Sequence, residues 1–254
     1  MSNLKESQKN PTTWLSDARN AIAMQINKKF CAVDSCGVDV IIEWEYIDAK
    51  SQFLSEKIKS LSQLLIDSYA KIELQFAKKY PENVKNEMFL ASLEPLLKDG
   101  VGNTDWVNVE KQIKAVLKSF FIETDWTKFS NDDDIHLFVI VRESNSEEPL
   151  GMAQFLITSE YDYATVKVAL YDGVMPLEPH RELNKLLISS IFKILPNIER
   201  IFLHTRSTNE EAINTHESFG FRKFSGNLIN WTDLEYLTKQ SNQLQELSKS
   251  LCHE

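Results

Sequence analysis

Apolar residues recur at helical spacing in two long stretches of the chain. The first covers residues 54–76 and stops before Pro81, whose ring cannot continue a helix. The second covers residues 106–120, and Thr104 precedes it as a candidate N-cap. The segment between them, residues 81–103, has no such stripe. We expect it to be an insertion made of short helical pieces and loop.

Shorter stripes of the same period indicate four further helices. Each has apolar residues three and four positions apart, and two of them end at a residue that typically stops a helix, Pro196 or Gly220. The expected helices cover residues 12–30, 182–195, 209–219 and a tail that starts at about residue 241.

Alternating or β-branched runs indicate strands between these helices. The run 135–142 and the run 150–158 are separated by a polar segment rich in Ser, Asn and Pro, which predicts a hairpin. The remaining expected strands cover residues 38–47, 164–171, 200–205, 220–224 and 232–239.

The resulting order is β, α, α, β, β, β, α, β, α, β, β. A helix between two strands predicts one parallel crossover, around residues 182–195, in a sheet that is otherwise built from antiparallel neighbours. We therefore expect an α/β fold with one mixed, mostly antiparallel sheet of six or seven strands and helices on both faces.

The composition is that of an ordinary globular protein. Of 254 residues, 43% are hydrophobic, and only 7 Gly and 7 Pro occur, so one buried core is expected. The formal net charge of -9 disfavours binding to nucleic acid or to anionic membranes, since both would repel the chain. A cationic amine substrate suits this charge, although acidity also serves solubility. No apolar run is long enough to cross a bilayer, and we expect a cytoplasmic protein.

Cysteine and histidine spacing gives no metal signal. Cys31, Cys36 and Cys252 form no paired zinc motif, and an odd count suggests reduced thiols, with a Cys31–Cys36 disulfide as an alternative. His180 and His204 have no cysteine or carboxylate neighbours at ligand spacing, so no metal site is expected.

The sequence NEEAINTHESFGF, from Asn209 to Phe221, resembles the last core helix of GNAT-type N-acetyltransferases. It follows a strand, as it does in that family, and the preceding hairpin and crossover helix are in family order. The resemblance implies a GNAT-like domain over residues 37–239, with the sheet splayed between the strands 164–171 and 200–205. It also implies acetyl-CoA as co-substrate.

The resemblance also implies which residues hold acetyl-CoA. Val174 and Met175 lie where the family offers backbone groups to the pantetheine arm, and Arg181, Asn184 and Asn209 are the further candidates. The family's glycine-rich loop binds pyrophosphate at a helix N-terminus, where free amides face an anion. Here Asn184 and Leu186 replace its small residues, so this loop is degenerate.

His216 stands where the family carries a tyrosine that protonates the departing thiolate. A histidine is able to do the same near neutral pH. The alternative is a polar residue on the exposed side of a short helix. Asp172 is the candidate general base, and the first-strand carboxylates Glu43 and Glu45 are alternatives that a solvated strand face also explains.

Two functions follow from these residues. One is acetyl-CoA-dependent N-acetylation of a small-molecule or peptide amine by direct transfer. The other is a catalytically inactive GNAT-fold protein that has lost acetyl-CoA binding and serves interaction or regulation. Trp44, Tyr46, Trp106 and Trp126 would line an acceptor pocket or belong to the core.

Two appendages flank the expected domain. Residues 1–36 carry an amphipathic helix, and residues 240–254 form a tail helix with Leu244, Leu247 and Leu251 on one face. An apolar face must be covered, either by the same chain or by a partner. The first alternative makes the tail a structural lid, and the second makes it the seam of a homodimer.

Overall fold

The computed structural model describes residues 11–25, 28–33, 39–48, 56–87, 90–97, 101–119, 134–146, 149–158, 160, 164–171, 181–224 and 231–253. Its α-helices are α1 (Pro11–Gln25), α2 (Glu56–Lys79), α3 (Trp106–Lys118), α4 (Arg181–Ile194), α5 (Glu210–Ser218) and α6 (Gln243–Ser250). Three 3-10 helices lie in the expected insertion: η1 (Pro81–Asn86), η2 (Ala91–Leu97) and η3 (Val101–Asn103). The strands are β1 (Phe30–Val33), β2 (Asp39–Asp48), β3 (Ile135–Glu143), β4 (Pro149–Ile157), β5 (Thr165–Tyr171), β6 (Arg200–Arg206), β7 (Arg222–Lys223), β8 (Trp231–Leu237) and β9 (Cys252–His253).

All nine of these strands form one sheet in the order β7-β8-β6-β5-β4-β3-β2-β1-β9. β5 and β6 are parallel neighbours joined by the crossover helix α4, and the other neighbouring pairs are antiparallel. This confirms the mixed, mostly antiparallel fold. The described sheet has nine strands instead of six or seven, because β1 and β9 were not expected.

Phe30 explains the first of these two misses. Its spacing from the apolar residues before it fits a helix, which led us to extend the N-terminal helix to residue 30. In the structure α1 ends at Gln25, and Phe30 begins a strand that pairs with Ile42 of β2. Four consecutive apolar residues, Phe30 to Val33, form a strand as readily as a helical turn, and pairing with β2 decides between the two.

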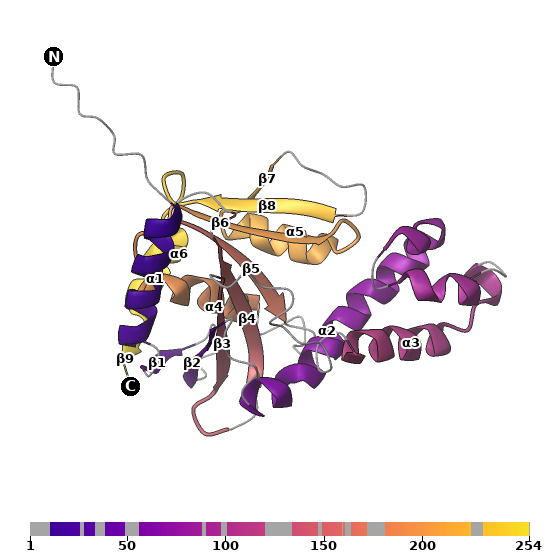
Figure 1. Ribbon diagram of the computed structural model, residues 1–254, viewed down its shortest axis with the longest axis horizontal. Helices are drawn as coiled ribbons and strands as arrows, with labels where there is room; N and C mark the ends of the chain where they lie inside the picture. Colours follow the sequence, from indigo (N-terminus) through magenta and orange to yellow (C-terminus); the bar gives the residue numbers. More distant parts are fainter. Residues whose placement is uncertain are drawn as a thin grey trace, which may run out of the picture.

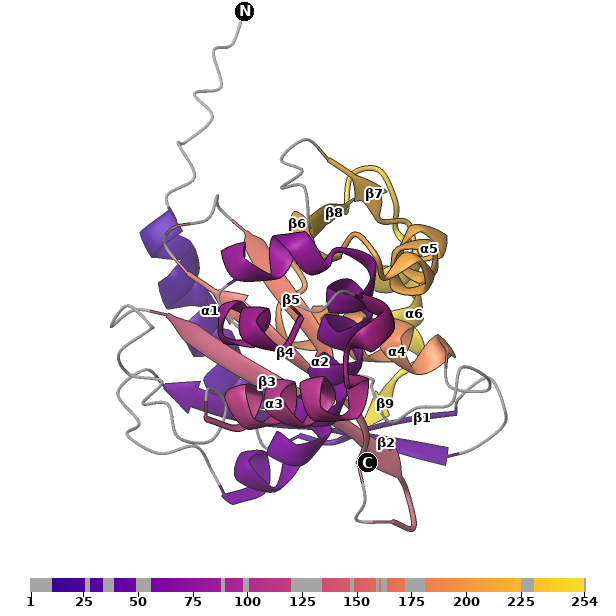
Figure 2. The same cartoon turned by 90° about the vertical axis from the view of Figure 1, so that its right-hand side faces the viewer.

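Helices cover both faces of the sheet (Figures 1 and 2). On one face α1, α4, α5 and α6 contribute to the main apolar core together with every second residue of β2 to β6. On the other face α2, α3, η1 and η2 enclose a smaller cluster that reaches the sheet at Phe138, Ile140 and Met152. The alternation of strand residues between the two clusters fixes which side chains face α2 and which face α4.

The two terminal helices contribute buried residues to the main core. In α1, Trp14, Leu15 and Ile22 are at most 4% exposed, and at the tail Leu244 and Leu251 are at most 2% exposed. α6 packs against α4, with which it shares this core. The apolar faces of both helices are therefore covered by the same chain, as the structural-lid alternative requires.

The start of α3 differs in detail from the expectation. Asp105, and not Thr104, is the N-cap: its Oδ1 accepts hydrogen bonds from the amides of Val107 (3.2 Å) and Asn108 (3.1 Å). An aspartate at this position also complements the positive end of the helix dipole, which a threonine does not.

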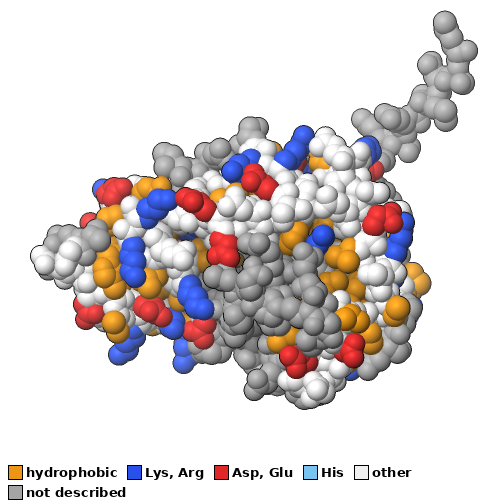
Figure 3. Space-filling model, turned by 180° about the vertical axis from the view of Figure 1, so that it is seen from behind, with side chains coloured by type: hydrophobic (Ala, Val, Ile, Leu, Met, Phe, Trp, Pro, Cys, Tyr) orange, Lys and Arg blue, Asp and Glu red, His pale blue; other side chains and the backbone are white. Residues whose placement is uncertain are grey.

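Charged groups of both signs intermingle over the helical layer of α2 and α3, seen at the left of Figure 3. Lys114, for example, lies 3.1 Å from Asp67 and 3.0 Å from Glu110. Among the helices that the structure describes, none is both long and apolar enough to span a membrane.

Candidate active site

β5 and β6 diverge after a short parallel contact. Their register pairs run from Thr165 with Arg200 to Lys167 with Phe202, and the described parts of both strands continue beyond this point without further pairs. Figure 1 shows β6 and β8 turning away from β5. The edge of β5 that faces β6 therefore has backbone groups that are available to a third partner placed between the strands.

α4 is the crossover helix between these two strands, and it begins directly after residues 172–180. Asp172, Val174 and Met175 belong to that segment and lie outside the described residues. The backbone of Arg181 opens α4, while its side chain also lies outside the described part. A helix N-terminus offers free amides to an anion, the property that the resemblance requires of this element.

Asn184 and Leu186, which replace the family's small residues, are both buried in α4, at 7% and 4% exposed. The side chain of Leu186 packs in the main core. Its bulk is therefore accommodated by the apolar interior under α4.

Asn209 joins the end of β6 to the start of α5. Its Oδ1 accepts a hydrogen bond from the amide of Ala212 (3.4 Å), and its Nδ2 donates to Oγ1 of Thr205 (3.3 Å). The side chain thus has a structural role as N-cap of α5. At the other end of α5 the expected glycine, Gly220, has a φ of +94°, which a residue with a Cβ rarely adopts.

His216 is buried, which corrects the alternative of an exposed polar residue. Its side chain is 5% exposed, and its ring centroid lies 6.1 Å from that of Phe219 and 5.6 Å from that of Phe221. Phe221 in turn contacts Tyr236 of β8 at 5.6 Å. His216 therefore belongs to an aromatic cluster that packs α5 against the sheet. The pattern of a short polar helix does not reveal this buried position.

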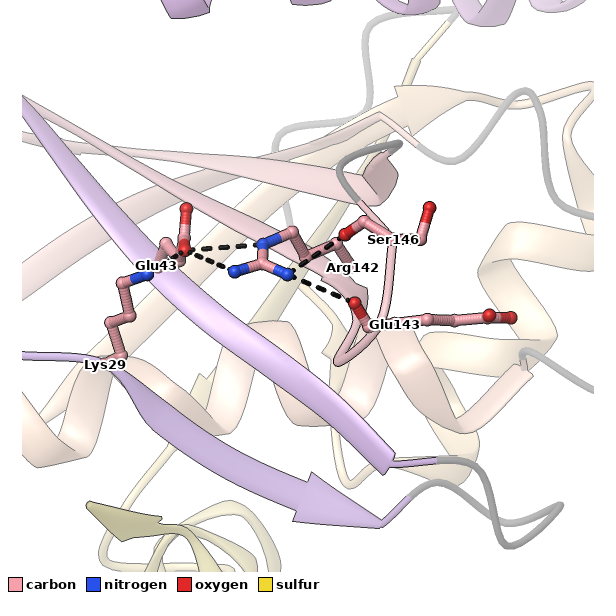
Figure 4. Close-up of polar contacts among 5 residues, drawn as sticks. All are labelled: Lys29, Glu43, Arg142, Glu143 and Ser146. Atoms are coloured by element: carbon pink, nitrogen blue, oxygen red, sulfur yellow. Dashed lines mark hydrogen bonds and ion pairs between the residues drawn. The ribbon is translucent and has the colours of Figure 1, made fainter. Parts of the chain in front are cut away.

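Glu43, one alternative for the general base, is engaged in ion pairs (Figure 4). One of its carboxylate oxygens lies 2.8 Å from Nζ of Lys29, and it accepts hydrogen bonds from Arg142 at 3.0 Å (Nη2) and 3.3 Å (Nε). Arg142 also donates to the carbonyl oxygens of Glu143 and Ser146 at the β3–β4 turn. β2 is separated from β5 by three strand spacings, about 14 Å, so Glu43 is a structural residue of the sheet. The side chain of Glu45 lies outside the described residues.

Of the four aromatic residues proposed for an acceptor pocket, two have described side chains, and both pack against apolar clusters. Trp44 is 5% exposed and belongs to the main core, where its ring centroid lies 6.0 Å from that of Phe155. Trp106 is half-buried against the smaller cluster under α2 and α3. Trp126 and the side chain of Tyr46 lie outside the described residues.

Three titratable residues meet where the splay begins, on the face covered by α2. Lys167 lies in the last register pair of β5 with β6, and His204 on β6 is directly opposite Asp233 on β8. Burial lowers the pKa of Lys167, opposed by the charge of Asp233, and burial raises the pKa of Asp233, opposed by Lys167. A carboxylate with a raised pKa is a better proton acceptor than an ordinary one.

His204 completes this group. Its ring centroid lies 5.3 Å from that of Trp231, and part of the side chain reaches the surface. Desolvation is the largest cause that lowers the pKa of His204, to about 4, and the charges of Lys167 and Arg206 lower it further. His204 is therefore neutral at physiological pH. Sequence reasoning missed this group; the available signal was a lysine within the apolar run of residues 164–171.

Arg206 fixes the outer wall of the splay. Its guanidinium is 1% exposed, lies between the rings of Phe76 (4.1 Å) and Trp231 (4.0 Å), and forms ion pairs with Glu73 and Glu87. Burial raises the pKa of Glu73, against the lowering effect of Arg206. The last residue of β6 is thus tied to α2 and to the C-cap of η1. Among the described residues, no group of three or more potential ligands could hold a metal ion.

Comparison with known proteins gives one family match and several similar solved structures. Residues 104–221 match the model of the acetyltransferase (GNAT) family. The N-acetyltransferase PseH of Campylobacter jejuni is 10% identical, with a TM-score of 0.39 over 77% of this chain and 97% of that chain. The PaiA N-acetyltransferase of Thermoplasma acidophilum, in complex with coenzyme A, is 14% identical, with a TM-score of 0.42 over 77% and 98%.

A third solved structure is the spermidine N-acetyltransferase of Vibrio cholerae, in complex with CoA and spermine. It is 10% identical, with a TM-score of 0.41 over 78% of this chain and 96% of that chain. A search of curated proteins finds no match to this chain.

Proposed function

Because residues 104–221 match the model of the acetyltransferase (GNAT) family, we propose that this protein is an acetyl-CoA-dependent N-acetyltransferase that acts on an amine. The observation that carries the proposal is the divergence of β5 from β6, the two parallel strands that the crossover helix α4 joins. This arrangement supplies an open strand edge for an amide-containing arm and a helix terminus for an anion. A pantetheine arm that ends in pyrophosphate needs both.

The residues of the splay have distinct tasks in this proposal. Acetyl-CoA supplies a thioester whose acyl carbon bonds to the amine nitrogen as the carbon–sulfur bond breaks. Backbone amides of β5 stabilise the charge that develops on the acyl oxygen. We assign Val174 and Met175, which follow β5 in the sequence, to the pantetheine arm, Arg181 and Asn184 to the pyrophosphate, and Asn209 to the cofactor side of α5, whose N-cap it forms.

Proton transfer is assigned to His216 as acid and to Asp172 or Asp233 as base. His216 donates a proton to the departing sulfur. The attacking nitrogen must first lose a proton, and Asp172 remains the candidate base from the sequence. Asp233 is a second candidate, because it borders the splay apex and burial raises its pKa. The net charge of -9 favours a cationic small-molecule or peptide amine as acceptor.

The second candidate function is an interaction or regulatory protein on the same fold that does not bind acetyl-CoA. It is favoured by Asn184 and Leu186 at the positions of the family's small residues, since no glycine occurs between Gly173 and Gly220. Backbone that must turn tightly around a phosphate usually requires glycine.

Calorimetric titration with acetyl-CoA separates the two functions. Saturable heat and a rise in melting temperature support the enzyme, because a ligand that binds only the native state stabilises it. Release of free CoA thiol, measured with a panel of primary amines and polyamines, then tests turnover. No heat and no thermal shift at millimolar acetyl-CoA would instead favour the interaction protein.

Two substitutions on β8 test the assignment of the base. Asp233→Asn should lower kcat and remove the acid limb of the pH–rate profile, while acetyl-CoA affinity is retained. Glu235→Gln is the matched control, since Glu235 lies on the same strand face but is engaged by Arg200 and Arg222. An unchanged pH–rate profile in Asp233→Asn would leave Asp172 as the base.

A further inference from the structure

Two cysteines from opposite ends of the sequence lie opposite each other in the sheet. β1 and β9 are antiparallel neighbours, with Phe30 paired to His253 and Cys31 paired to Cys252. Directly opposite residues of an antiparallel pair point to the same face, with their Cβ atoms about 4.5–5.5 Å apart. Both cysteines are thiols in the structure.

The backbone geometry of this pair suits a disulfide. Opposite residues in antiparallel strands have Cα atoms about 4.5 or about 5.5 Å apart, depending on their place in the ladder. Disulfides in proteins join Cα atoms about 4.4–6.8 Å apart. The Cβ atoms of a disulfide are about 3.5–4.5 Å apart, so disulfide formation requires β9, a two-residue edge strand, to move slightly closer to β1.

Both thiols are accessible to a small oxidant. Cys31 and Cys252 line one surface cavity of about 390 Å³, together with Val33, Ile41 and Ser250. Cys252 is exposed and Cys31 is half-buried. Sγ of Cys252 lies 3.7 Å from the carbonyl oxygen of Ser250, a contact weak enough to be given up on reaction.

We propose that Cys31 and Cys252 form a thiol pair that closes to a disulfide and staples β9 to β1. With glutathione disulfide as oxidant, the exposed Cys252 thiolate attacks one sulfur and releases a glutathione thiolate. Cys31 then attacks the mixed disulfide and releases the second glutathione. The two cysteines lose two electrons and two protons in total, and two glutathione thiols are formed.

The staple closes a loop that includes nearly the whole chain. Cross-linking distant residues restricts the unfolded state most strongly when the loop between them is long. β9 follows α6, whose Leu244 is fully buried against the main core, so the bond also fixes α6 on α4. We expect oxidation to raise the melting temperature by roughly 5–10 °C.

Peptide mapping of the full chain, treated with glutathione disulfide and then with a thiol-blocking reagent, tests the pairing. Trypsin alone leaves Cys31 and Cys36 in one peptide, since no lysine or arginine lies between them. A second protease that cleaves before Asp34 separates them. The expected product joins the Cys31 peptide to the Cys252 peptide in a monomeric chain.

Three variants complete the experiment. The melting temperature should rise on oxidation in the wild type and in the matched control Cys36→Ser, and should not rise in Cys31→Ser or Cys252→Ser. A Cys31–Cys36 bond, a persistent glutathione adduct on Cys252, or a disulfide between two chains would each overturn the proposal. So would a Cys31–Cys252 bond that leaves the melting temperature unchanged.

Discussion

Arg206 donates two hydrogen bonds to the carboxylate of Glu73, from Nε at 3.1 Å and from Nη2 at 2.6 Å, and both side chains are 1% exposed. The pair joins the last residue of β6 to the C-terminal third of α2. It therefore holds one wall of the splay against α2.

Replacing Arg206 by Met should destabilise the fold by about 3–5 kcal/mol, because Glu73 would remain buried without its partner. Urea denaturation measures the change. Lys249→Met is the control: its partner Glu246 is exposed, and the loss should stay below about 1 kcal/mol. Similar losses in the two variants would mean that the Arg206 pair does not hold β6 to α2.

His204 predicts a loss of stability in acid. Its pKa is about 4 in the folded chain, against an ordinary value of 6.5, so the unfolded chain binds the proton more readily between these values. The contribution of neutral His204 to the free energy of unfolding is fully present above pH 6.5. This free energy falls as the pH drops towards 4.

Urea midpoints at about pH 7.5 and about pH 4.5 measure this effect. His204→Gln, which carries no titratable ring, should lose less stability between the two conditions than the wild type. Equal acid sensitivity in the wild type and in the variant would contradict the assignment.

His216→Phe separates the catalytic role of the ring from its packing role. Phenylalanine preserves the aromatic contacts with Phe219 and Phe221, so the melting temperature should change little. If His216 protonates the leaving thiolate, kcat should fall by roughly 100-fold or more while acetyl-CoA affinity is retained. Unchanged turnover would show that the residue only packs α5 against the sheet.

Leu244→Ala tests whether the tail is a structural lid. Leu244 is fully buried, and its truncation leaves a cavity that should cost about 2–5 kcal/mol. Met24→Ala on α1 is the control, since Met24 is 70% exposed. Light scattering of the full chain measures the homodimer alternative, which a monomer at high concentration would contradict.

The fold was largely predictable because most strands and helices have a clear period. The exceptions are the short strands β1 and β9, which are recognisable only by their pairing with neighbouring strands. The four residues of β1 match the helical period and the strand period equally well. Asp105 was missed as N-cap because Thr104 satisfies the same local rule.

The candidate site was less predictable, because strand pairing assembles it. Lys167, His204 and Asp233 lie on three different strands, and only the parallel crossover and the β6–β8 register bring them together. The ion pairs of Glu43 depend on a contact with Arg142, which is distant in sequence. Local pattern identifies the residue types but not these partners.

Both margins of the nine-stranded sheet are two-residue strands, β7 and β9. An open sheet edge offers unpaired backbone groups to any other extended chain, and short or charged edge strands limit that risk of aggregation. β7, with Arg222 and Lys223, is both short and basic. β9 instead shields β1, whose sequence FCAV is uncharged and would otherwise present its backbone to a second molecule. Displacement of β9 would therefore convert this margin into a template for intermolecular strand addition.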